Sequence, residues 1–341
     1  MSVPKTMKAV QVRGGKGASD KLFLDDVDVP QLRDGEVLVR VLTAGVNRMD
    51  CLEREGQYPV PAHSNGIMGV EYAGKVVASN ASDGPKVGDE VFGLTVGGCY
   101  AEYVAAPASM LLQKPAELSF EECAAVPEVW LTAYQALFWL NDLKKGEDVL
   151  VHAGASSVGL AAVQLARRHG ARNIYVTAGS PEKIETCKSV GATDGINYKD
   201  GDWAEKLKSL TGDGGVDVIL DFLGASYFAQ NLASLKRDGR MSMQGFMGGV
   251  KVDDTSLAPI LMKRLRITGS TLRSRDLEYQ GRLLQELQKQ GIIDALVKAE
   301  QDNKHRIVIH KVFDLAQVKE AHDMMEANQN SGKIVLRVAR D

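Results

Sequence analysis

The segment at residues 149–166 constrains the fold of this chain more than any other stretch of the sequence. It reads VLVHAGASSVGLAAVQLA: an apolar run typical of a buried strand, a turn of small residues, and an amphipathic run typical of a helix. A helix that begins directly after a strand presents unpaired backbone N–H groups and a partial positive charge at the turn. The segment therefore predicts one βα unit whose turn can bind an anion.

The alternation of strand and helix continues to about residue 270. Short buried strands separated by amphipathic helices are typical of a parallel sheet that is covered on both faces. Strands are predicted at VLVH (149–152), IYVT (174–177), GINY (195–198), DVILDF (217–222), RMSMQG (240–245) and LRITGS (265–270), with helices at about 157–169, 181–190, 202–211 and 227–236. The expected fold class is therefore α/β, with a doubly wound parallel sheet.

The regions on either side of this alternation read as β-rich. Residues 1–125 contain short apolar runs separated by Gly, Pro, Asn and Asp, which is typical of a partly open barrel or sandwich. The tail reads as strand RIVIHKVF, a helix with Asp314 as a plausible N-cap, and strand KIVLRVA. This tail has no place in the doubly wound sheet. We therefore predict one domain at 126–299 and a second at 1–125, completed by 300–341.

Composition excludes several classes of protein. The 341 residues suit two domains, and the net charge of −3, with both signs interleaved, argues against nucleic-acid or membrane-surface binding. The four cysteines are scattered without a C-x-x-C pair, so neither disulfides nor a cysteine zinc site is expected. We expect no signal peptide, and the longest apolar stretch, Val129–Leu140, is too short to span a bilayer. A cytoplasmic protein is expected.

The turn itself favours a dinucleotide. Gly154 can form the tight turn and Gly159 can allow the helix to pack on the strand, as in a Rossmann βα unit. Ser156 stands where a strict G-x-G-x-x-G motif has glycine, and it fits only if that position does not need a positive φ. The alternative is an ordinary tight turn in a flavodoxin-like sheet. The position of the turn at the start of a βαβ series favours the dinucleotide.

The end of the second strand favours NADPH over NADH. A site for NAD usually ends this strand with an acid that binds the ribose 2′-hydroxyl. Here IYVT runs into Ala178-Gly179-Ser180, and Lys183 follows one turn later. A hydroxyl donor and a cation suit a 2′-phosphate. Alternatively Ser180 is a plain N-cap and Lys183 a solvated charge, but neither alternative explains the missing acid.

These residues lie within a resemblance that covers essentially the whole chain. The sequence resembles the zinc-independent quinone oxidoreductases of the medium-chain dehydrogenase/reductase superfamily, and is most similar to their p53-inducible branch. The stretches that carry the resemblance are AGVNRMDCLEREGQY (44–58), GVEYAG (69–74), PEVWLTAYQAL (127–137), VLVHAGASSVG (149–159), VTAGSPEKIETCKSVGA (176–192), GINYKD (195–200), TLRSRD (271–276) and EAHDMMEANQNSGKIVL (320–336).

The resemblance implies a GroES-like barrel domain joined to a Rossmann domain, NADPH as cofactor, and a homodimer. It also places Tyr198 beside the 2′-phosphate, although a half-buried tyrosine at a strand end is an alternative. Thr132 is expected to begin the helix that leads into the Rossmann domain. The residues assigned to the cofactor are Asn47, Thr132, Gly154, Ser156, Ser157, Val158, Gly159, Gly179, Ser180, Lys183, Tyr198, Gly245, Phe246, Met247, Ser270, Leu272, Arg273 and Lys333.

No metal is expected. Zinc-dependent relatives carry a cysteine ligand where this chain has Asn47, and a histidine in a G-H-E motif where it has Gly69-Val70-Glu71. Three protein ligands are the usual minimum for catalytic zinc. Without a Lewis acid the acceptor must already be electron-poor, as quinones and conjugated carbonyl compounds are. The protein then supplies mainly orientation.

Two residues are the catalytic candidates that the resemblance implies. Asn47 matches a position beside the nicotinamide and substrate, and its amide could bind the ribose or the acceptor oxygen. Tyr58 is similar to a tyrosine of the quinone pocket and could donate to the developing oxyanion, although it could also be a loop aromatic that only packs. Lys333 either reaches the cofactor or is a lysine that protects a strand edge.

Three functions stay open on the sequence alone. The leading hypothesis is an NADPH-dependent quinone oxidoreductase. An NADPH-dependent reductase of enone or alkenal double bonds could use the same scaffold. A non-enzymatic NADPH-regulated RNA-binding or structural protein is the third, and the interleaved charges do not favour RNA.

Overall fold

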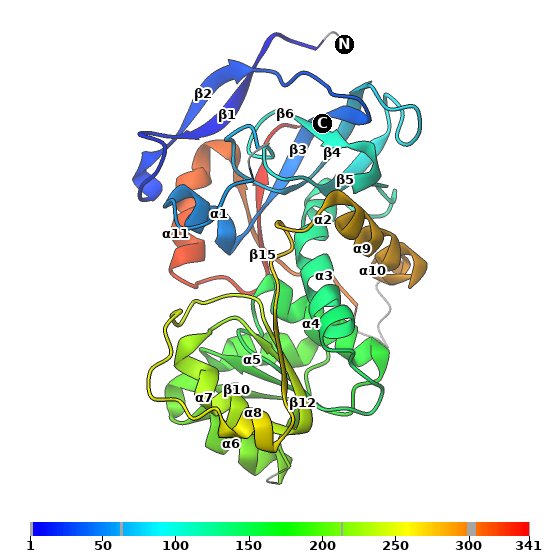
Figure 1. Ribbon diagram of the computed structural model, residues 1–341. Helices are drawn as coiled ribbons and strands as arrows, with labels where there is room; N and C mark the ends of the chain where they lie inside the picture. Colours follow the sequence, from blue (N-terminus) through cyan, green and yellow to red (C-terminus); the bar gives the residue numbers. More distant parts are fainter. Residues whose placement is uncertain (1–2, 62–63, 213, 299–304, 341) are drawn as a thin grey trace. The chain divides into compact units, whose positions relative to one another are not determined.

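The computed structural model describes residues 3–61, 64–212, 214–298 and 305–340, and the chain forms two compact units (Figure 1). Unit 1 comprises Met1–Glu128, Arg273–Val297 and Ile307–Asp341. Unit 2 comprises Val129–Leu272 and Lys298–Arg306. The α/β class is confirmed, because unit 2 contains a parallel sheet with connecting helices and unit 1 contains a largely antiparallel sheet.

Among its described residues, unit 2 contains six parallel strands in the order β10-β9-β8-β11-β12-β13. This is the doubly wound arrangement predicted from the sequence, and it reverses direction between β8 and β11. The strands are β8 (Val149–Val151), β9 (Ile174–Ala178), β10 (Asp194–Asn197), β11 (Val216–Asp221), β12 (Leu235–Met243) and β13 (Arg266–Gly269). The helices are α4 (Ser157–His169), α5 (Pro181–Ser189), α6 (Trp203–Thr211), α7 (Ala225–Ser234) and α8 (Ala258–Met262), and the 3₁₀ turn η4 is Tyr198–Asp200.

The helices of unit 2 begin and end where the local chemistry favours it. Ser156, Ser180 and Asp202 accept backbone N–H groups as N-caps of α4, α5 and α6. Gly170 and Gly212 end α4 and α6 in the left-handed conformation that glycine adopts at little cost. One apolar cluster of this unit gathers side chains from the sheet, the helices and their connections: Leu150, Tyr175, Ile196, Trp203, Leu207, Val216, Ile219, Leu235 and Met241.

In the part of unit 1 that the structure describes, seven strands form one sheet. Its order is β14-β15-β3-β4-β5-β7, with β6 also paired to β3, and all these pairs except β14–β15 are antiparallel. The strands are β3 (Glu36–Val46), β4 (Glu71–Ser79), β5 (Glu90–Leu94), β6 (Tyr103–Pro107), β7 (Leu111–Gln113), β14 (Ile309–Asp314) and β15 (Lys333–Arg337). A separate antiparallel pair is formed by β1 (Thr6–Val12) and β2 (Leu22–Asp28).

The C-terminal tail joins unit 1, as its sequence predicts. Ile334 of β15 pairs with Val46 of β3, and helix α11 (Val318–Glu326) lies between β14 and β15 along the chain. Asp314 caps the 3₁₀ turn η5 (Leu315–Gln317) that precedes α11, through a capping box with Gln317. The tail therefore completes the sheet formed by the N-terminal part of the chain.

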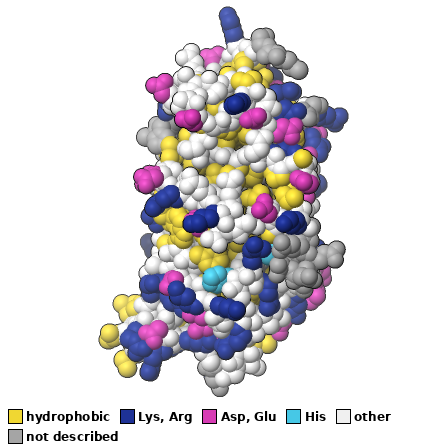
Figure 2. All heavy atoms as spheres, turned by 90° about the vertical axis from the view of Figure 1, so that its right-hand side faces the viewer, with side chains coloured by type: hydrophobic (Ala, Val, Ile, Leu, Met, Phe, Trp, Pro, Cys, Tyr) yellow, Lys and Arg dark blue, Asp and Glu magenta, His cyan; other side chains and the backbone are white. Residues whose placement is uncertain are grey.

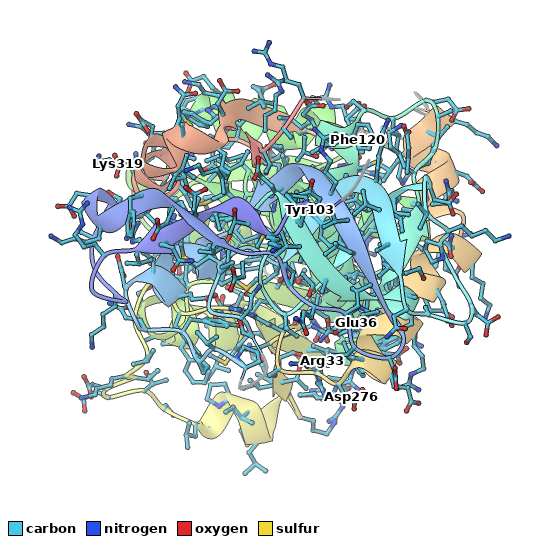
Figure 3. The ribbon with its side chains drawn as sticks, turned by 90° about the horizontal axis from the view of Figure 1, so that it is seen from above. Arg33, Glu36, Tyr103, Phe120, Asp276 and Lys319 are labelled. Atoms are coloured by element: carbon cyan, nitrogen blue, oxygen red, sulfur yellow. The ribbon has the colours of Figure 1, made fainter. Side chains whose placement is uncertain are left out.

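Shorter helices of unit 1 follow the strands of this sheet along the chain. Helix α1 (Arg48–Arg54) directly follows β3, and α2 (Phe120–Ala124) follows β7 after the loop that ends at Ser119. Figure 3 labels Phe120 on α2 and Tyr103 on β6, and Thr43 of β3 donates to the Phe120 carbonyl at 2.7 Å. Helix α3 (Pro127–Tyr134) and a π-helical segment, η3 (Gln135–Leu140), carry the chain into unit 2.

Two of the helices that were not predicted follow the parallel sheet in the sequence. Helix α9 (Leu277–Lys289) begins at the N-cap Asp276, and α10 (Ile292–Lys298) follows it. The predicted boundary placed this segment with the parallel-sheet domain, whereas its contacts group Arg273–Val297 with unit 1. The reason is packing: Leu283, Leu284 and Leu287 of α9 are buried, and α9 contacts the 3₁₀ turn η2 (Ala108–Met110).

The outer surface carries charges of both signs. On the face drawn in Figure 2, Lys and Arg side chains lie among Asp and Glu side chains. Within the described ranges, none of the helices combines the length and the apolar character needed to cross a membrane.

Candidate active site

The turn between β8 and α4 has the geometry of an anion site. Ala153 takes the positive φ of +47° in this turn, whereas Ser156 has a φ of −67° and a ψ of 162°. The position of Ser156 therefore does not need glycine. The Ser156 hydroxyl accepts the Gly159 N–H at 3.1 Å as the N-cap of α4. The N–H groups of Ser157 and Val158 lie in the first helical turn, where a helix offers no internal acceptor.

Both glycines of the turn are required by close contacts. A Cβ on Gly154 would lie 2.5 Å from the Val176 Cβ, and a Cβ on Gly159 would lie 2.5 Å from the Gly154 carbonyl oxygen. These contacts hold the turn against β9 and hold α4 against the turn. A larger residue at either position would displace the backbone that a phosphate approaches, so the turn fits the pyrophosphate of a dinucleotide.

The residues expected at a 2′-phosphate are together at the end of β9. A Cβ on Gly179 would lie 2.7 Å from the Tyr198 hydroxyl, which places the tyrosine directly over the glycine. Ser180 caps α5 by accepting the Lys183 N–H at 3.4 Å. Burial and then the neighbouring Lys199 lower the pKa of Lys183, so two lysines lie near each other at this end of β9. This arrangement suits a dianionic phosphate better than a bare ribose hydroxyl.

The remaining predicted cofactor residues of unit 2 follow the next strands along the sheet. Gly245, Phe246 and Met247 follow β12, and Ser270 and Leu272 follow β13. Because all six strands are parallel, these segments lie at the same edge of the sheet as the β8–α4 turn. Phe246 and Met247 are exposed, whereas Leu272 is buried.

Thr132 differs from its prediction. It lies within α3 and does not begin it, because the helix starts at Pro127, a residue well suited to a first helical position.

A second group of predicted residues lies in unit 1 at one end of its sheet. Asn47 directly follows β3, while Glu71 and Lys333 begin β4 and β15, the two antiparallel neighbours of β3. The end of β3 therefore meets the starts of both neighbours. The Lys333 ammonium forms an ion pair with Glu71 and donates to Asn47 Oδ1 at 2.7 Å. Asn47 Nδ2 donates to the same Glu71 Oε1 at 2.8 Å.

This Asn47–Glu71–Lys333 triad is built into the core of unit 1. Glu71 and Lys333 are 0% and 1% exposed, whereas Asn47 is half-buried. The second oxygen of Glu71 accepts the Glu128 backbone N–H at 2.9 Å. A Cβ on Gly45 would lie 2.5 Å from Glu71 Oε1, so the carboxylate occupies the space next to a glycine of β3.

Asp50, in the first turn of α1, binds the main chain of Asn47. The Asp50 carboxylate accepts the Asn47 N–H at 2.7 Å, which caps α1, and the Tyr100 hydroxyl at 2.9 Å. Burial, and then the nearby Glu53, raise the pKa of Asp50 to about 7; the Asn47 N–H, the Tyr100 hydroxyl and Lys333 act against this rise. Asn47 is therefore fixed both by its side chain and by its main chain.

Besides the triad and Asp50, unit 1 holds the predicted residues Tyr58 and Arg273, which lie near each other. The Arg273 guanidinium pairs with Glu53, donates to the Val96 carbonyl at 2.9 Å, and lies 5.8 Å from the centre of the Tyr58 ring. Burial and then Glu128 raise the pKa of Tyr58 to about 12, so the phenol keeps its proton at neutral pH. Tyr58 can therefore act as a hydrogen-bond donor.

The buried acids of unit 1 were not among the site residues predicted from the sequence. Glu71, Asp50 and Glu53 are buried here, and Glu71 anchors two predicted residues. Two signals were available: an acid at the start of an otherwise apolar strand, and an Asp three residues after an N-cap Asn. Glu128 lies next to these acids, since its backbone N–H binds Glu71. Its side chain is partly shielded from solvent, and burial and then Glu71 raise its pKa to about 8. No group of three His, Cys, Asp or Glu among the described residues is arranged to hold a metal ion.

Comparison with known proteins gives relatives along the full length. Residues 33–116 match the family model for an alcohol dehydrogenase GroES-like domain, and residues 157–289 match the one for a zinc-binding dehydrogenase. Human quinone oxidoreductase is 32% identical to this chain and covers 97% of it, with 98% of the human protein matched.

Solved structures of other proteins are similar to this chain over nearly its whole length. The Escherichia coli quinone oxidoreductase complexed with NADPH has a TM-score of 0.85 at 26% identity, over 97% of this chain and 100% of that one. The CurK enoyl reductase has a TM-score of 0.83 at 29% identity, over 98% of this chain and 100% of that one.

Proposed function

We propose that this chain, which belongs to the medium-chain dehydrogenase/reductase superfamily and is an oxidoreductase, transfers hydride from NADPH to quinones. The observation that carries the NADPH assignment is the group Gly179, Ser180, Lys183 and Tyr198 at the end of β9, where a site for NAD would carry an acid. The full-length similarity to quinone oxidoreductases supports the choice of acceptor.

Each unit has a distinct role in this proposal. Bound NADPH supplies the hydride, and the β8–α4 turn holds its pyrophosphate through backbone N–H groups. In unit 1, Asn47 and Tyr58 contact the acceptor, whose oxygen gains negative charge during the reaction. The Tyr58 phenol keeps its proton at neutral pH and donates a hydrogen bond to that oxygen.

The test is to measure NADPH oxidation with an ortho-quinone and with a simple enone, and to identify the products. A control assay uses NADH in place of NADPH. Fast turnover of the quinone with NADPH alone supports the proposal. Equal rates with NADH would contradict the cofactor assignment. Nucleotide binding without turnover of either acceptor would contradict the enzymatic function.

A double-bond reductase is the second candidate. It is favoured by one observation, the similarity to the CurK enoyl reductase over nearly the whole chain. Saturation of the enone double bond with little quinone turnover would select this function. The same cofactor site and the same Asn47 and Tyr58 would serve it.

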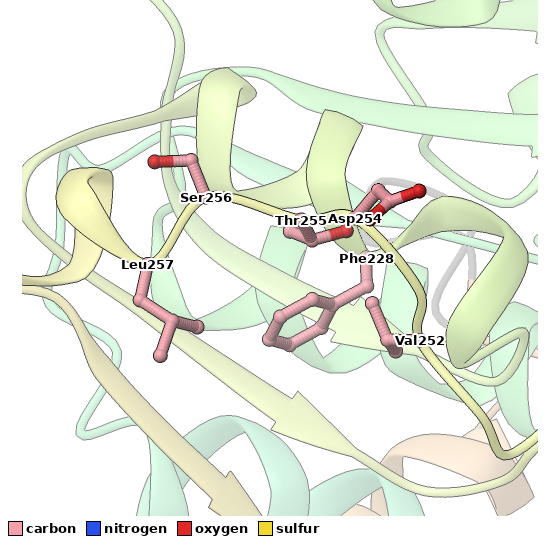
Figure 4. Close-up of a pocket in the computed structure, with 6 residues that line it drawn as sticks. All are labelled: Phe228, Val252, Asp254, Thr255, Ser256 and Leu257. Atoms are coloured by element: carbon pink, nitrogen blue, oxygen red, sulfur yellow. The ribbon is translucent and has the colours of Figure 1, made fainter.

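We also propose a homodimer formed through the β13 end of the unit 2 sheet. β13 is the terminal strand of that sheet among the described residues, and the preceding segment exposes apolar side chains. Val250, Leu257 and Leu261 are 70%, 66% and 79% exposed, and Figure 4 shows the hollow that Leu257 lines with Phe228 and Val252. Such a patch is typical of an interface.

The dimer is tested by light scattering after size-exclusion chromatography. Leu261→Glu places a charge in the patch and is expected to give a monomer. The matched control is Val87→Glu in unit 1, where the side chain is 64% exposed. A monomeric wild-type protein would contradict the proposal.

A further inference from the structure

The Asn47 amide has one fixed orientation, set by its two buried neighbours. The Lys333 ammonium has only hydrogens to offer, so it must face the amide oxygen, and it lies 2.7 Å from Oδ1. The Glu71 carboxylate is fixed by its ion pair with Lys333 and accepts from Nδ2 at 2.8 Å. The chemistry of the two partners therefore assigns the oxygen and the nitrogen of the amide without ambiguity.

This orientation decides what Asn47 offers to a ligand. One N–H of the amide is bound to Glu71, and the amide oxygen already accepts from Lys333. The group that remains on the nitrogen is its second N–H. Asn47 is half-buried and can reach a ligand, whereas Glu71 and Lys333 are 0% and 1% exposed and are held inside unit 1.

From this arrangement we infer that Lys333 and Glu71 are positioning residues that turn the Asn47 amide so that its N–H points to the acceptor oxygen of the substrate. The inference rests on the proposed reduction of a quinone or conjugated carbonyl compound. Lys333 acts on the reaction through Asn47 and not through a contact with the cofactor phosphate. Without Lys333 the amide can rotate and present its oxygen, which repels a developing oxyanion.

Further contacts outside the triad fix Glu71 and Asn47 in place. Gly45 leaves the space that the Glu71 carboxylate fills, since a Cβ there would lie 2.5 Å from Oε1. The other carboxylate oxygen accepts the Glu128 N–H, so Glu71 cannot rotate freely. Asp50 holds the Asn47 main chain through its N–H at 2.7 Å. The main chain and the side-chain amide of Asn47 are therefore each held by named contacts.

The test is a double-mutant cycle of Lys333→Met and Asn47→Ala, singly and together, in the full-length chain. If Lys333 acts through Asn47, Lys333→Met lowers kcat for an ortho-quinone on the order of 10- to 100-fold. NADPH affinity, measured by nucleotide fluorescence at several salt concentrations, changes less than about twofold, and the double variant is no slower than Asn47→Ala. A purely structural role for Lys333 would not produce this loss of additivity.

The matched control is Lys114→Met. Lys114 is another shielded lysine of unit 1, with a side chain 7% exposed, and it pairs with Glu90 at 3.2 Å. Its loss is expected to change stability and to leave kcat within about twofold, because Lys114 has no contact with the triad. If Lys333→Met does not fold, Glu71→Gln combined with Lys333→Met removes both charges together and still deprives the amide oxygen of its donor.

Two results would overturn the inference. Additive effects of Lys333→Met and Asn47→Ala on kcat would show that the two residues act separately. Weaker NADPH binding in Lys333→Met, with a reduced dependence on salt, would show that the lysine contacts a phosphate. A wild-type chain without turnover of the quinone or the enone would overturn the proposed function as well, so the two failures are distinguishable.

Discussion

The β8–α4 turn of unit 2 and the Asn47–Glu71–Lys333 triad of unit 1 are assembled in opposite ways. The turn consists of consecutive residues, from Ala153 to Gly159, and its binding groups are backbone N–H groups. The triad joins side chains that are 286 positions apart in the sequence, through neighbouring strands of one sheet. A site of the first kind depends on the absence of side chains, and a site of the second kind depends on buried charge.

The largest expected effect is the loss of folding stability when the buried ion pair between Lys333 and Glu71 is broken. Lys333→Met leaves Glu71 without its cation at 0% exposure, and breaking one partner of a buried pair costs about 3–5 kcal/mol. Urea unfolding measures the loss. Glu71→Gln combined with Lys333→Met should recover most of it, because no charge then stays uncompensated. Lys114→Met should cost less, since its partner Glu90 is 36% exposed.

NADPH affinity should be almost as sensitive to substitution in the β8–α4 turn, because a side chain on its glycines collides with the backbone. Gly159→Val places a Cβ 2.5 Å from the Gly154 carbonyl oxygen and 2.6 Å from that of Ala153, so the turn must open. We expect NADPH affinity to fall about 100-fold, the equivalent of about 3 kcal/mol. Gly281→Ala is the control, because its nearest neighbour beyond the local helix is 3.8 Å away. Unchanged NADPH binding in Gly159→Val would contradict the assignment of the turn.

The raised pKa of Asp50 in unit 1 and the lowered pKa of Asp148 in unit 2 should give pH responses in opposite directions. In unit 1, Asp50 has its pKa raised from 3.8 to about 7, so the folded state holds an extra proton between these values, and stability falls as the pH rises through them. In unit 2, burial acts to raise the pKa of Asp148, but hydrogen bonds from Arg172, Lys236 and Asn173 lower it to about 2. Its contribution is therefore lost as the pH falls below about 4.

Hydrogen exchange on peptides from each unit separates these responses. Peptides around Asp50 should lose protection by roughly 2–3 kcal/mol between pH 4 and pH 7. Asp50→Asn should reduce that slope without abolishing it, because the raised pKa of Glu128 acts in the same direction. Asp148→Asn should flatten the acid response of unit 2 and leave unit 1 unchanged. A slope that either substitution leaves unchanged would contradict the pKa shift assigned to that residue.

The cofactor preference should change by an intermediate amount. Lys183→Glu replaces a cation at the end of β9 with an anion, which repels a 2′-phosphate and suits a ribose 2′-hydroxyl. We expect the preference for NADPH over NADH to fall on the order of 10- to 100-fold, as measured by the ratio of kcat/KM values. Lys188→Glu on the same helix, beyond the first turn, is the control. An unchanged preference would remove the basis for NADPH.

The difference between the two regions also explains what the sequence could predict. Each βα unit is a local pattern, so the six parallel strands and the helices α4–α7 were predicted close to their observed bounds. The tail was assigned to unit 1 because it had no place in the parallel sheet, and β15 does pair with β3. The sequence also carries a local signal for α9, in the N-cap Asp276 and the helical spacing of Leu283, Leu284 and Leu287.

The triad could not be predicted in the same way. Asn47 and Lys333 were named as separate residues, and their contact depends on the pairing of β15 with β3, which no local pattern specifies. Glu71 was noted only as part of the motif that lacks a zinc-binding histidine. Its role becomes visible only when both neighbouring strands are in place, because its partners come from each side.

Ser156 gives the smallest expected effect and the finest test of the turn. Its φ of −67° is accessible to every residue, and its hydroxyl accepts the Gly159 N–H at 3.1 Å. Replacing an N-cap serine with glycine costs only a few tenths of a kcal/mol, so Ser156→Gly should bind NADPH within about twofold of wild type. A tenfold loss would mean that the hydroxyl also donates to a phosphate. Ser156→Asp keeps the cap but adds a negative charge, and should weaken NADPH far more than it weakens folding.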